Sequence, residues 1–221
     1  MSLHAVLFDM DGLIFNTEAH FEQAWQHAAT LQGRSLDLAL YRSTIGMKRA
    51  HFEPRIIEQL GPGLDIERYR WDRDAHFHRL RQQGLQYQPG FEALFEALGQ
   101  RGIKRALVTS SHWPDVEHNF AGSDYLHRFD THVCGDSVQN GKPAPDCYLL
   151  GCEQLAVAPG QTLALEDSNN GMRAAIAAGC RAVMVPDRQT PADDVRRHAH
   201  ALLPSLADVL AQDLLESGSR E

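Results

Sequence analysis

The chain has 221 residues, and 43% of them are hydrophobic, which is enough apolar material for a folded core. Its 29 acidic residues outnumber its 21 Lys and Arg, and the net charge of −8 argues against binding nucleic acid or anionic membrane through bulk charge. No stretch approaches the roughly 20 apolar residues of a membrane span, and the N-terminus lacks a signal-like pattern, so we expect a cytoplasmic monomer with a small-molecule substrate.

The first predicted element is a strand over Ala5–Phe8, a short apolar run that suits a strand buried on both faces. Asp9 and Asp11 follow it directly, and Gly12 permits a sharp turn. In an open parallel sheet, ligands bind at the carboxyl ends of the strands, so these carboxylates are candidate reactive groups. An Asp-Gly turn whose carboxylates bond nearby backbone N–H groups is an equally simple interpretation.

The next part of the chain has a helical pattern that no strand-like run interrupts. Its apolar residues form two stripes at helical spacing, namely Phe21, Trp25 and Ala28, and then Phe52, Ile56 and Leu60. A third helix is predicted over residues 66–83, and Asn16 or Thr17 is a suitable N-cap for the first. We expect residues 16–88 to form a small helical domain.

Helices and short apolar runs alternate in the remainder of the chain. The predicted helices cover Phe91–Gln100, residues 114–120, Asp146–Leu155, residues 170–178 and residues 206–215, and the predicted strands cover residues 105–108, 131–134, 162–165 and 181–185. This alternation predicts an α/β fold, a doubly wound parallel sheet with helices on both faces. Residues 1–15 and 89–221 would form this core, into which the helical domain is inserted.

Polar groups follow three of the predicted strands. They are Asp9 with Asp11, Thr109 with Ser110, and Glu166 with Asp167. If the strands are parallel, these groups meet at one edge of the sheet, and Lys142 can reach the same edge from a loop. Independent turn residues would rarely produce such a set.

The combination suits phosphoryl transfer. Asp9, Glu166 and Asp167 are hard oxygen ligands for Mg²⁺, a cation that lets a carboxylate approach a phosphate dianion. Asp9 could then attack phosphorus in line, while Lys142 and the hydroxyl of Thr109 hold the equatorial oxygens. Asp11 could protonate the leaving oxygen and later take a proton from the attacking water.

These motifs, in this order, resemble those of haloacid dehalogenase superfamily phosphohydrolases that carry a helical cap on a Rossmann-like core. The four motifs are matched by Asp9-Met-Asp11-Gly12, by Thr109, by Lys142-Pro143 and by Glu166-Asp167. The resemblance implies that Asp9 is the nucleophile and Asp11 the acid/base. It also implies Mg²⁺ bound by Asp9, the backbone carbonyl of Asp11, Glu166 and Asp167, with phosphate contacts from Thr109, Lys142 and the Ser110 N–H.

Within this superfamily the chain is similar to β-phosphoglucomutase-like phosphatases and, over residues 138–146, to pseudouridine-5′-phosphatase. Two positions depart from the pattern. Asn16 stands where many relatives have Asp, which alters the charge near the hinge. The mutases place a cap histidine beside the acid/base, whereas an ungapped alignment puts Phe21 there and leaves His20 one position early, a rotation of about 100° on a helix.

The segment Gly46-Met-Lys48-Arg49 resembles the cap loop that reaches into the site in this superfamily. Arg49 is a candidate for a second contact to an anion or hydroxyl of the substrate, and a solvated arginine at a helix start is the alternative. We therefore predict an Mg²⁺-dependent phosphatase of a small phosphorylated metabolite of the sugar or nucleotide monophosphate type. A sugar phosphomutase of the β-phosphoglucomutase type is the alternative, and a non-catalytic binding module on the same fold is a third interpretation.

Overall fold

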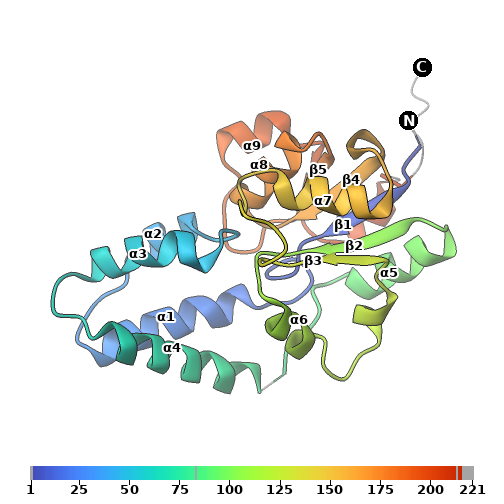
Figure 1. Ribbon diagram of the computed structural model, residues 1–221. Coiled ribbons are helices and arrows are strands. Elements are labelled where there is room, and N and C mark those ends of the chain that lie inside the picture. Colours follow the sequence, from blue (N-terminus) through green and yellow to red (C-terminus); the bar gives the residue numbers. More distant parts are fainter. Residues whose placement is uncertain (1, 83, 213, 216–221) are drawn as a thin grey trace.

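The computed structural model of the protein describes residues 2–82, 84–212 and 214–215. Six parallel strands form one sheet in the order β3-β2-β1-β4-β5-β6. The strands are β1 Ala5–Phe8, β2 Lys104–Val108, β3 Thr131–Val133, β4 Thr162–Glu166, β5 Arg181–Met184 and β6 Ala201–Leu202. The predicted fold class is confirmed, with β1 at the centre of the sheet (Figure 1).

Helices cover both faces of this sheet. Successive side chains of β1 point to opposite faces and all are apolar, so both faces must be shielded from water. Val6 and Phe8 belong to an apolar cluster with α5 (Phe91–Gln100), α6 (Trp113–Asn119) and α10 (Ala207–Ala211). Ala5 and Leu7 belong to the cluster on the other face. Its helices are α7 (Asp146–Leu155), α8 (Asn169–Ala177) and α9 (Asp193–His198).

Most predicted core elements agree with the observed bounds within one or two residues. The strand β6, the helix α9 and two 3₁₀ helices, Tyr125–Arg128 and Pro159–Gln161, were not predicted. The helix predicted over residues 206–215 is shorter than expected, because α10 ends at Ala211. Part of that prediction and the polar tail after residue 215 lie outside the described residues.

The helical insertion consists of α1 (Glu18–Leu31), α2 (Leu38–Ser43), α3 (Arg49–Leu60) and α4 (Ile66–Arg81), and it lies to one side of the sheet (Figure 1). It has an apolar core of its own, built around Trp25, Tyr41, Ile56 and Tyr69. The insertion between β1 and α5 is confirmed, although α2 was not foreseen as a separate helix. The division at residues 15/16 and 88/89 stays a prediction.

The two segments that join this cap to the core lie side by side. Phe15 and Tyr87 form an isolated antiparallel bridge and their rings stack with centroids 5.0 Å apart. Backbone hydrogen bonds also join Asn16 to Gln86 at 3.3 Å and Gln88 to Ile14 at 2.7 Å. The chain therefore enters and leaves the cap at the same place, which is the geometry of a single hinge.

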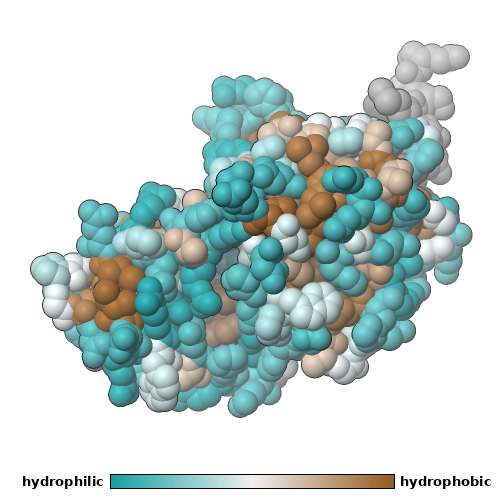
Figure 2. All heavy atoms as spheres, viewed as in Figure 1, coloured by the Kyte–Doolittle hydropathy of each residue, from teal (hydrophilic) through white to brown (hydrophobic). Residues whose placement is uncertain are grey.

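The face of the molecule in Figure 2 is mostly hydrophilic, and its apolar side chains gather at the far end of the cap and over the core helices. Among the described helices, none is both long and apolar enough to cross a membrane.

Candidate active site and metal-binding group

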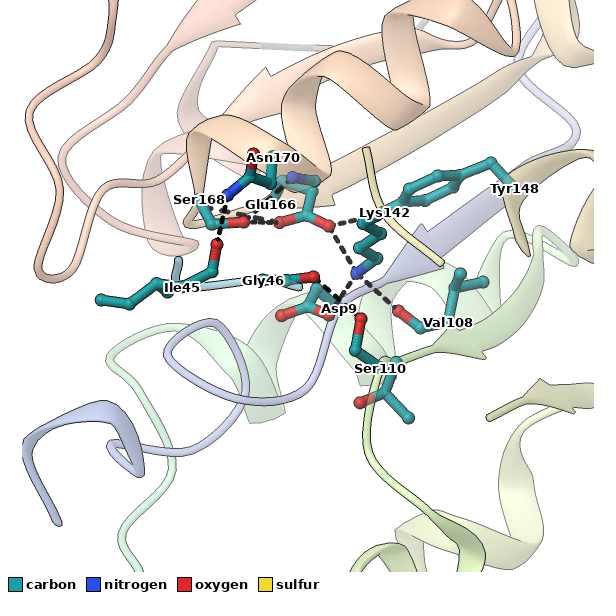
Figure 3. A network of polar contacts seen from close by, with 12 residues as sticks. Asp9, Ile45, Gly46, Val108, Ser110, Lys142, Tyr148, Glu166, Ser168 and Asn170 are labelled. Carbon is teal, nitrogen blue, oxygen red and sulfur yellow. Dashed lines mark hydrogen bonds and ion pairs between the residues drawn. The ribbon is translucent and has the colours of Figure 1, made fainter. Parts of the chain in front are cut away.

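Asp9 lies directly after β1, at the carboxyl edge of the sheet, and only 6% of its surface is exposed. Lys142 reaches it from the loop before α7, and its ammonium donates to Asp9 Oδ1 at 2.5 Å. The same ammonium donates to the backbone carbonyl of Val108, the last residue of β2, at 3.1 Å, and to Glu166 Oε1 at 2.6 Å. Lys142 therefore ties three neighbouring strand ends together (Figure 3).

Glu166, the last residue of β4, is completely buried and held from several sides. The Tyr148 hydroxyl donates to its Oε1 at 2.5 Å, and the Ser168 hydroxyl donates to its Oε2 at 3.2 Å. A Cβ at Gly171 would lie only 1.9 Å from Oε1, so this position must be glycine for the carboxylate to fit. Ser168 also caps α8 by accepting from the Gly171 N–H.

Asp9, Glu166 and Asp167 form a group that could hold a metal ion. One carboxylate oxygen from each lies within 4.8 Å of the others. Asp167 is 1% exposed, and neither of its carboxylate oxygens has a hydrogen-bond partner among the described residues. A buried carboxylate without a partner is costly unless a cation neutralises it, so the donor set fits a hard divalent cation such as Mg²⁺.

The pKa shifts of Asp9, Asp167 and Lys142 also indicate a site that needs a cation. Burial, opposed by Lys142 and helped by Glu166, raises the pKa of Asp9 to about 8. Burial, together with the charges of Asp9 and Glu166, holds the pKa of Asp167 well above its usual range. Burial alone would lower the pKa of Lys142, but Asp9 and Glu166 outweigh it and the pKa is raised. One ammonium is therefore not enough to neutralise this site.

Asp11 lies two residues after Asp9 and outside this group of three. Its Oδ1 accepts from the Thr17 hydroxyl at 2.7 Å, and its Oδ2 accepts from the Ser111 hydroxyl at 2.6 Å. Burial raises the pKa of Asp11, against the lowering effect of these two hydrogen bonds. The sequence analysis expected Asp11 to bind the metal through its backbone carbonyl and not through its carboxylate. The position of the carboxylate therefore does not test that prediction.

The Thr17 interaction corrects one detail of the sequence analysis. Thr17 occupies the N-cap position of α1, but its backbone is helical there and its side chain makes no capping hydrogen bond. Its hydroxyl donates to Asp11. Thr17 belongs to the segment that leads into the cap. The candidate acid/base is thus bonded to the hinge.

Thr109, Ser110 and Arg49 all line the same cavity as Asp9 and Asp11. The Thr109 hydroxyl accepts from the Ser111 N–H at 3.0 Å, and the Ser110 hydroxyl donates to the carbonyl of Gly46 in the cap at 2.8 Å. Arg49 begins α3, and its side chain is 52% exposed. The structure thus brings every predicted site residue to one region, with Arg49 on the cap side of it.

The cavity has a volume of about 540 Å³ and lies between the cap and the carboxyl edge of the sheet. Phe21 from α1 forms part of its wall and stacks on Phe77, with ring centroids 4.1 Å apart. His20 is not among the residues that line it. Phe21, which the ungapped alignment sets against the cap histidine of the mutases, therefore presents a phenyl ring to the cavity.

Two functional candidates were missed by the sequence analysis. Glu18, the first residue of α1, lines the cavity and is 7% exposed, and burial with the charges of Asp11 and Asp9 holds its pKa well above the usual range. Its position at a helix start is ordinary for an acidic residue and gave no signal. Tyr148 lies in the predicted helix α7, and its bond to Glu166 depends on how that helix is rotated.

The cap and the core are joined by hydrogen bonds to backbone carbonyls. The Asn170 amide donates to Ser43 O at 3.1 Å. It also donates to Ile45 O at 2.9 Å, and the Ser110 hydroxyl donates to Gly46 O (Figure 3). In the opposite direction, the Lys48 ammonium of the cap donates to the carbonyl of Val138 in the core. The loop expected to reach the site therefore does so.

The fold and the site together are those of a doubly wound α/β core with an inserted helical cap and an acidic centre, suited to a metal ion, at the carboxyl edge of its sheet. The chain belongs to the haloacid dehalogenase-like hydrolase family, whose model matches residues 6–185. Its enzyme class is that of the phosphatases of this family, which hydrolyse phosphoric monoesters.

Individual relatives cover most of the chain. A protein named "Phosphorylated carbohydrates phosphatase" from Thermotoga maritima is 32% identical over 80% of this chain and 82% of its own length. A Drosophila melanogaster protein named "Probable pseudouridine-5'-phosphatase" is 33% identical over 91% and 89%. The crystal structure of mutant CbbY from Rhodobacter sphaeroides in complex with xylulose-(1,5)bisphosphate is similar with a TM-score of 0.77 and 28% identity, covering 94% of this chain and 96% of that one.

Proposed function

We propose that this protein is an Mg²⁺-dependent phosphatase of sugar monophosphates that works through an aspartyl-phosphate on Asp9. The observation that carries the proposal is the position of Asp9. It is a buried carboxylate at the floor of a cap-covered cavity, 2.5 Å from the Lys142 ammonium and two residues from a second carboxylate. The names of the relatives support a phosphorylated sugar as the substrate class.

The chemistry starts with the charge of Asp9. A carboxylate whose pKa is raised to about 8 is a poor nucleophile at neutral pH, because it is largely protonated. A divalent cation held by Asp9, Glu166 and Asp167 would supply the positive charge that ionises Asp9 and screens it from the phosphate. Lys142 lies beside Asp9, where it can stabilise negative charge on the transferring group.

Asp11 is suited to move the proton. Its raised pKa keeps the carboxyl group protonated at higher pH than usual, as a general acid for the leaving sugar oxygen requires. After the sugar leaves, the ionised Asp11 can take a proton from the water that cleaves the aspartyl-phosphate. The hydrogen bonds from Thr17 and Ser111 fix both of its oxygens, so its orientation depends on the hinge and on the loop after β2.

A mutase would have to keep the sugar in place and return the phosphate to it. The structure offers Phe21, stacked on Phe77, where such an enzyme would need a polar cap group. This wall favours a phosphatase.

The test is a screen of sugar and nucleoside monophosphates, read as free phosphate, with Mg²⁺ and with EDTA. We expect Mg²⁺-dependent release from one or more sugar monophosphates, and none from the Asp9→Asn variant. Lys104→Ala is a matched control, since Lys104 lies at the opposite end of β2 and donates to the carbonyl of Leu155. An Asp9→Asn protein that kept a substantial part of the wild-type rate would rule out the aspartyl-phosphate.

A further inference from the structure

The cavity wall opposite Asp9 belongs to the cap, and its cationic side chains are already engaged. The cations that line the cavity from the cap are Lys48, Arg49 and Arg73. Lys48 extends away to the core, where its ammonium donates to the carbonyl of Val138. Its role is thus to join the cap to the core, which leaves the two arginines as the cations of the far wall.

Asp74 of α4 contacts both arginines. Its Oδ1 accepts from Arg73 Nε at 2.8 Å and lies 3.6 Å from Arg49 Nη1. Arg73 is also bonded to Glu53 at 2.6 Å, and its guanidinium lies over the Trp25 ring at 4.6 Å. Arg73 therefore meets two carboxylates, of which Glu53 is shared with Arg70, and its N–H donors are directed at these partners.

Further acidic groups face the same cavity. Apart from Asp9 and Asp11, the described lining residues with a carboxylate are Glu18, Asp74, Asp115 and Asp136. Glu18 lies close to Asp9 and Asp11, whose charges raise its pKa, so the other three carboxylates equal the three cations in number. The part of the cavity away from the catalytic carboxylates therefore carries no excess of positive charge. A phosphate dianion is bound in proteins by cations and N–H donors, and here a second one would approach carboxylates instead.

Uncharged hydroxyl groups would find suitable partners on this wall. Both contacts of Asp74 use Oδ1, so its Oδ2 takes part in neither. Its side chain is 48% exposed and that of Arg49 is 52% exposed, which leaves an acceptor and several donors within reach of a ligand. The volume of about 540 Å³ is sufficient for a sugar phosphate.

We propose that Asp74 is a specificity-determining residue, which makes the cap select an uncharged sugar end and reject a second phosphate group. This inference rests on the proposed function. The structure of mutant CbbY with a bisphosphate shows that the fold itself admits such ligands, so the discrimination must come from side chains. Among the described lining residues, Asp74 is the carboxylate that contacts both far-wall arginines.

The test compares kcat/KM for fructose 1-phosphate and fructose 1,6-bisphosphate, read as free phosphate with Mg²⁺. We expect the wild-type enzyme to favour the monophosphate by about tenfold or more, as a like charge at a partly exposed site would produce. Asp74→Asn keeps the shape and one acceptor oxygen but removes the charge, so the ratio should fall by about tenfold. Asp74→Glu keeps the charge and should retain the preference.

Glu67→Gln is the matched control, because Glu67 is exposed on the same helix and does not line the cavity. It makes the same change in net charge and should leave the ratio unchanged. A wild-type preference for the bisphosphate, or an unchanged ratio in Asp74→Asn, would overturn the inference. If p-nitrophenyl phosphate is hydrolysed with Mg²⁺ in that case, the proposed phosphatase chemistry survives. The absence of phosphate release from all three esters would remove both proposals.

Discussion

The hydrogen bonds of Asn170 to the cap lead to a quantitative prediction about closure. Asn170 is the second residue of α8, three residues after Asp167, and is 7% exposed. Its amide donates to the carbonyls of Ser43 and Ile45 in the cap, at 3.1 and 2.9 Å. The variant Asn170→Ala would remove both bonds without touching any proposed catalytic side chain.

The expected size of the effect follows from the number of bonds. Each net hydrogen bond contributes about 1 kcal/mol, and in the open state the two carbonyls can bond water instead. The closed arrangement should therefore lose about 2 kcal/mol relative to the open one, which corresponds to a factor of about 30 in the ratio of the two states. If the cap must close before a sugar ester reacts, kcat/KM should fall by up to that factor.

The assay is steady-state phosphate release from the best sugar monophosphate and from p-nitrophenyl phosphate, with hydrogen exchange followed over residues 42–46. We expect the larger loss for the sugar ester, because its poor leaving group needs the cap and an aligned acid, and faster exchange in the cap segment. Gln154→Ala is the control, since Gln154 accepts a hydrogen bond from Thr131 within the core. Wild-type kinetics combined with wild-type exchange in Asn170→Ala would refute the idea that these bonds hold the cap closed.

Four further predictions test the site. Asp11→Asn should lower kcat for sugar esters far more than for p-nitrophenyl phosphate, whose leaving group needs little protonation; equal losses would show that Asp11 acts through Thr17 on the hinge. Asp167→Ala should raise the Mg²⁺ concentration at half-maximal activity, which a Mg²⁺ titration measures, and an unchanged value would exclude it as a ligand. Arg49→Ala should raise KM for the sugar monophosphate with little change for the aryl phosphate, whereas equal losses would indicate a role in folding. Because the folded-state pKa of Asp9 is raised to about 8, the metal-free protein binds an extra proton on folding. In EDTA its unfolding free energy should therefore fall as pH rises from about 4 to about 8, and the fall should exceed that of Asp9→Asn by at least about 1 kcal/mol. Urea unfolding at a series of pH values measures both, and an equal pH dependence in the two proteins would contradict the raised pKa.

The sheet could be predicted from the sequence because burial on both faces gives its strands continuous apolar runs. Ala5–Phe8 was predicted with its observed bounds, and β4 differs by one residue. Parallel pairing then brings the carboxyl ends of the strands together, which is why Asp9 and Glu166 could be expected to meet before any distance was known. Their catalytic roles stay predictions, since position alone does not test them.

Other features depend on contacts that a local pattern does not contain. The strand β6 has two residues, Ala201–Leu202, and exists only because it pairs with β5. The helix α2 has six residues, too few to show a period, and its N-cap Asp37 was not recognised. Tyr148 and Glu18 belong to correctly expected helices, but their proximity to the site depends on helix rotation and on the angle between cap and core.

The carboxylates of the site explain why function and stability oppose each other here. Asp9, Glu166, Asp167 and Glu18 are all at least nine-tenths buried, and the one lysine among them already bonds to two. A core built only for stability would replace such a set by apolar side chains, because every unneutralised buried charge costs free energy. Its excess of negative charge suits a site completed by a divalent cation. The cation should therefore stabilise the folded protein and activate Asp9 for the same electrostatic reason.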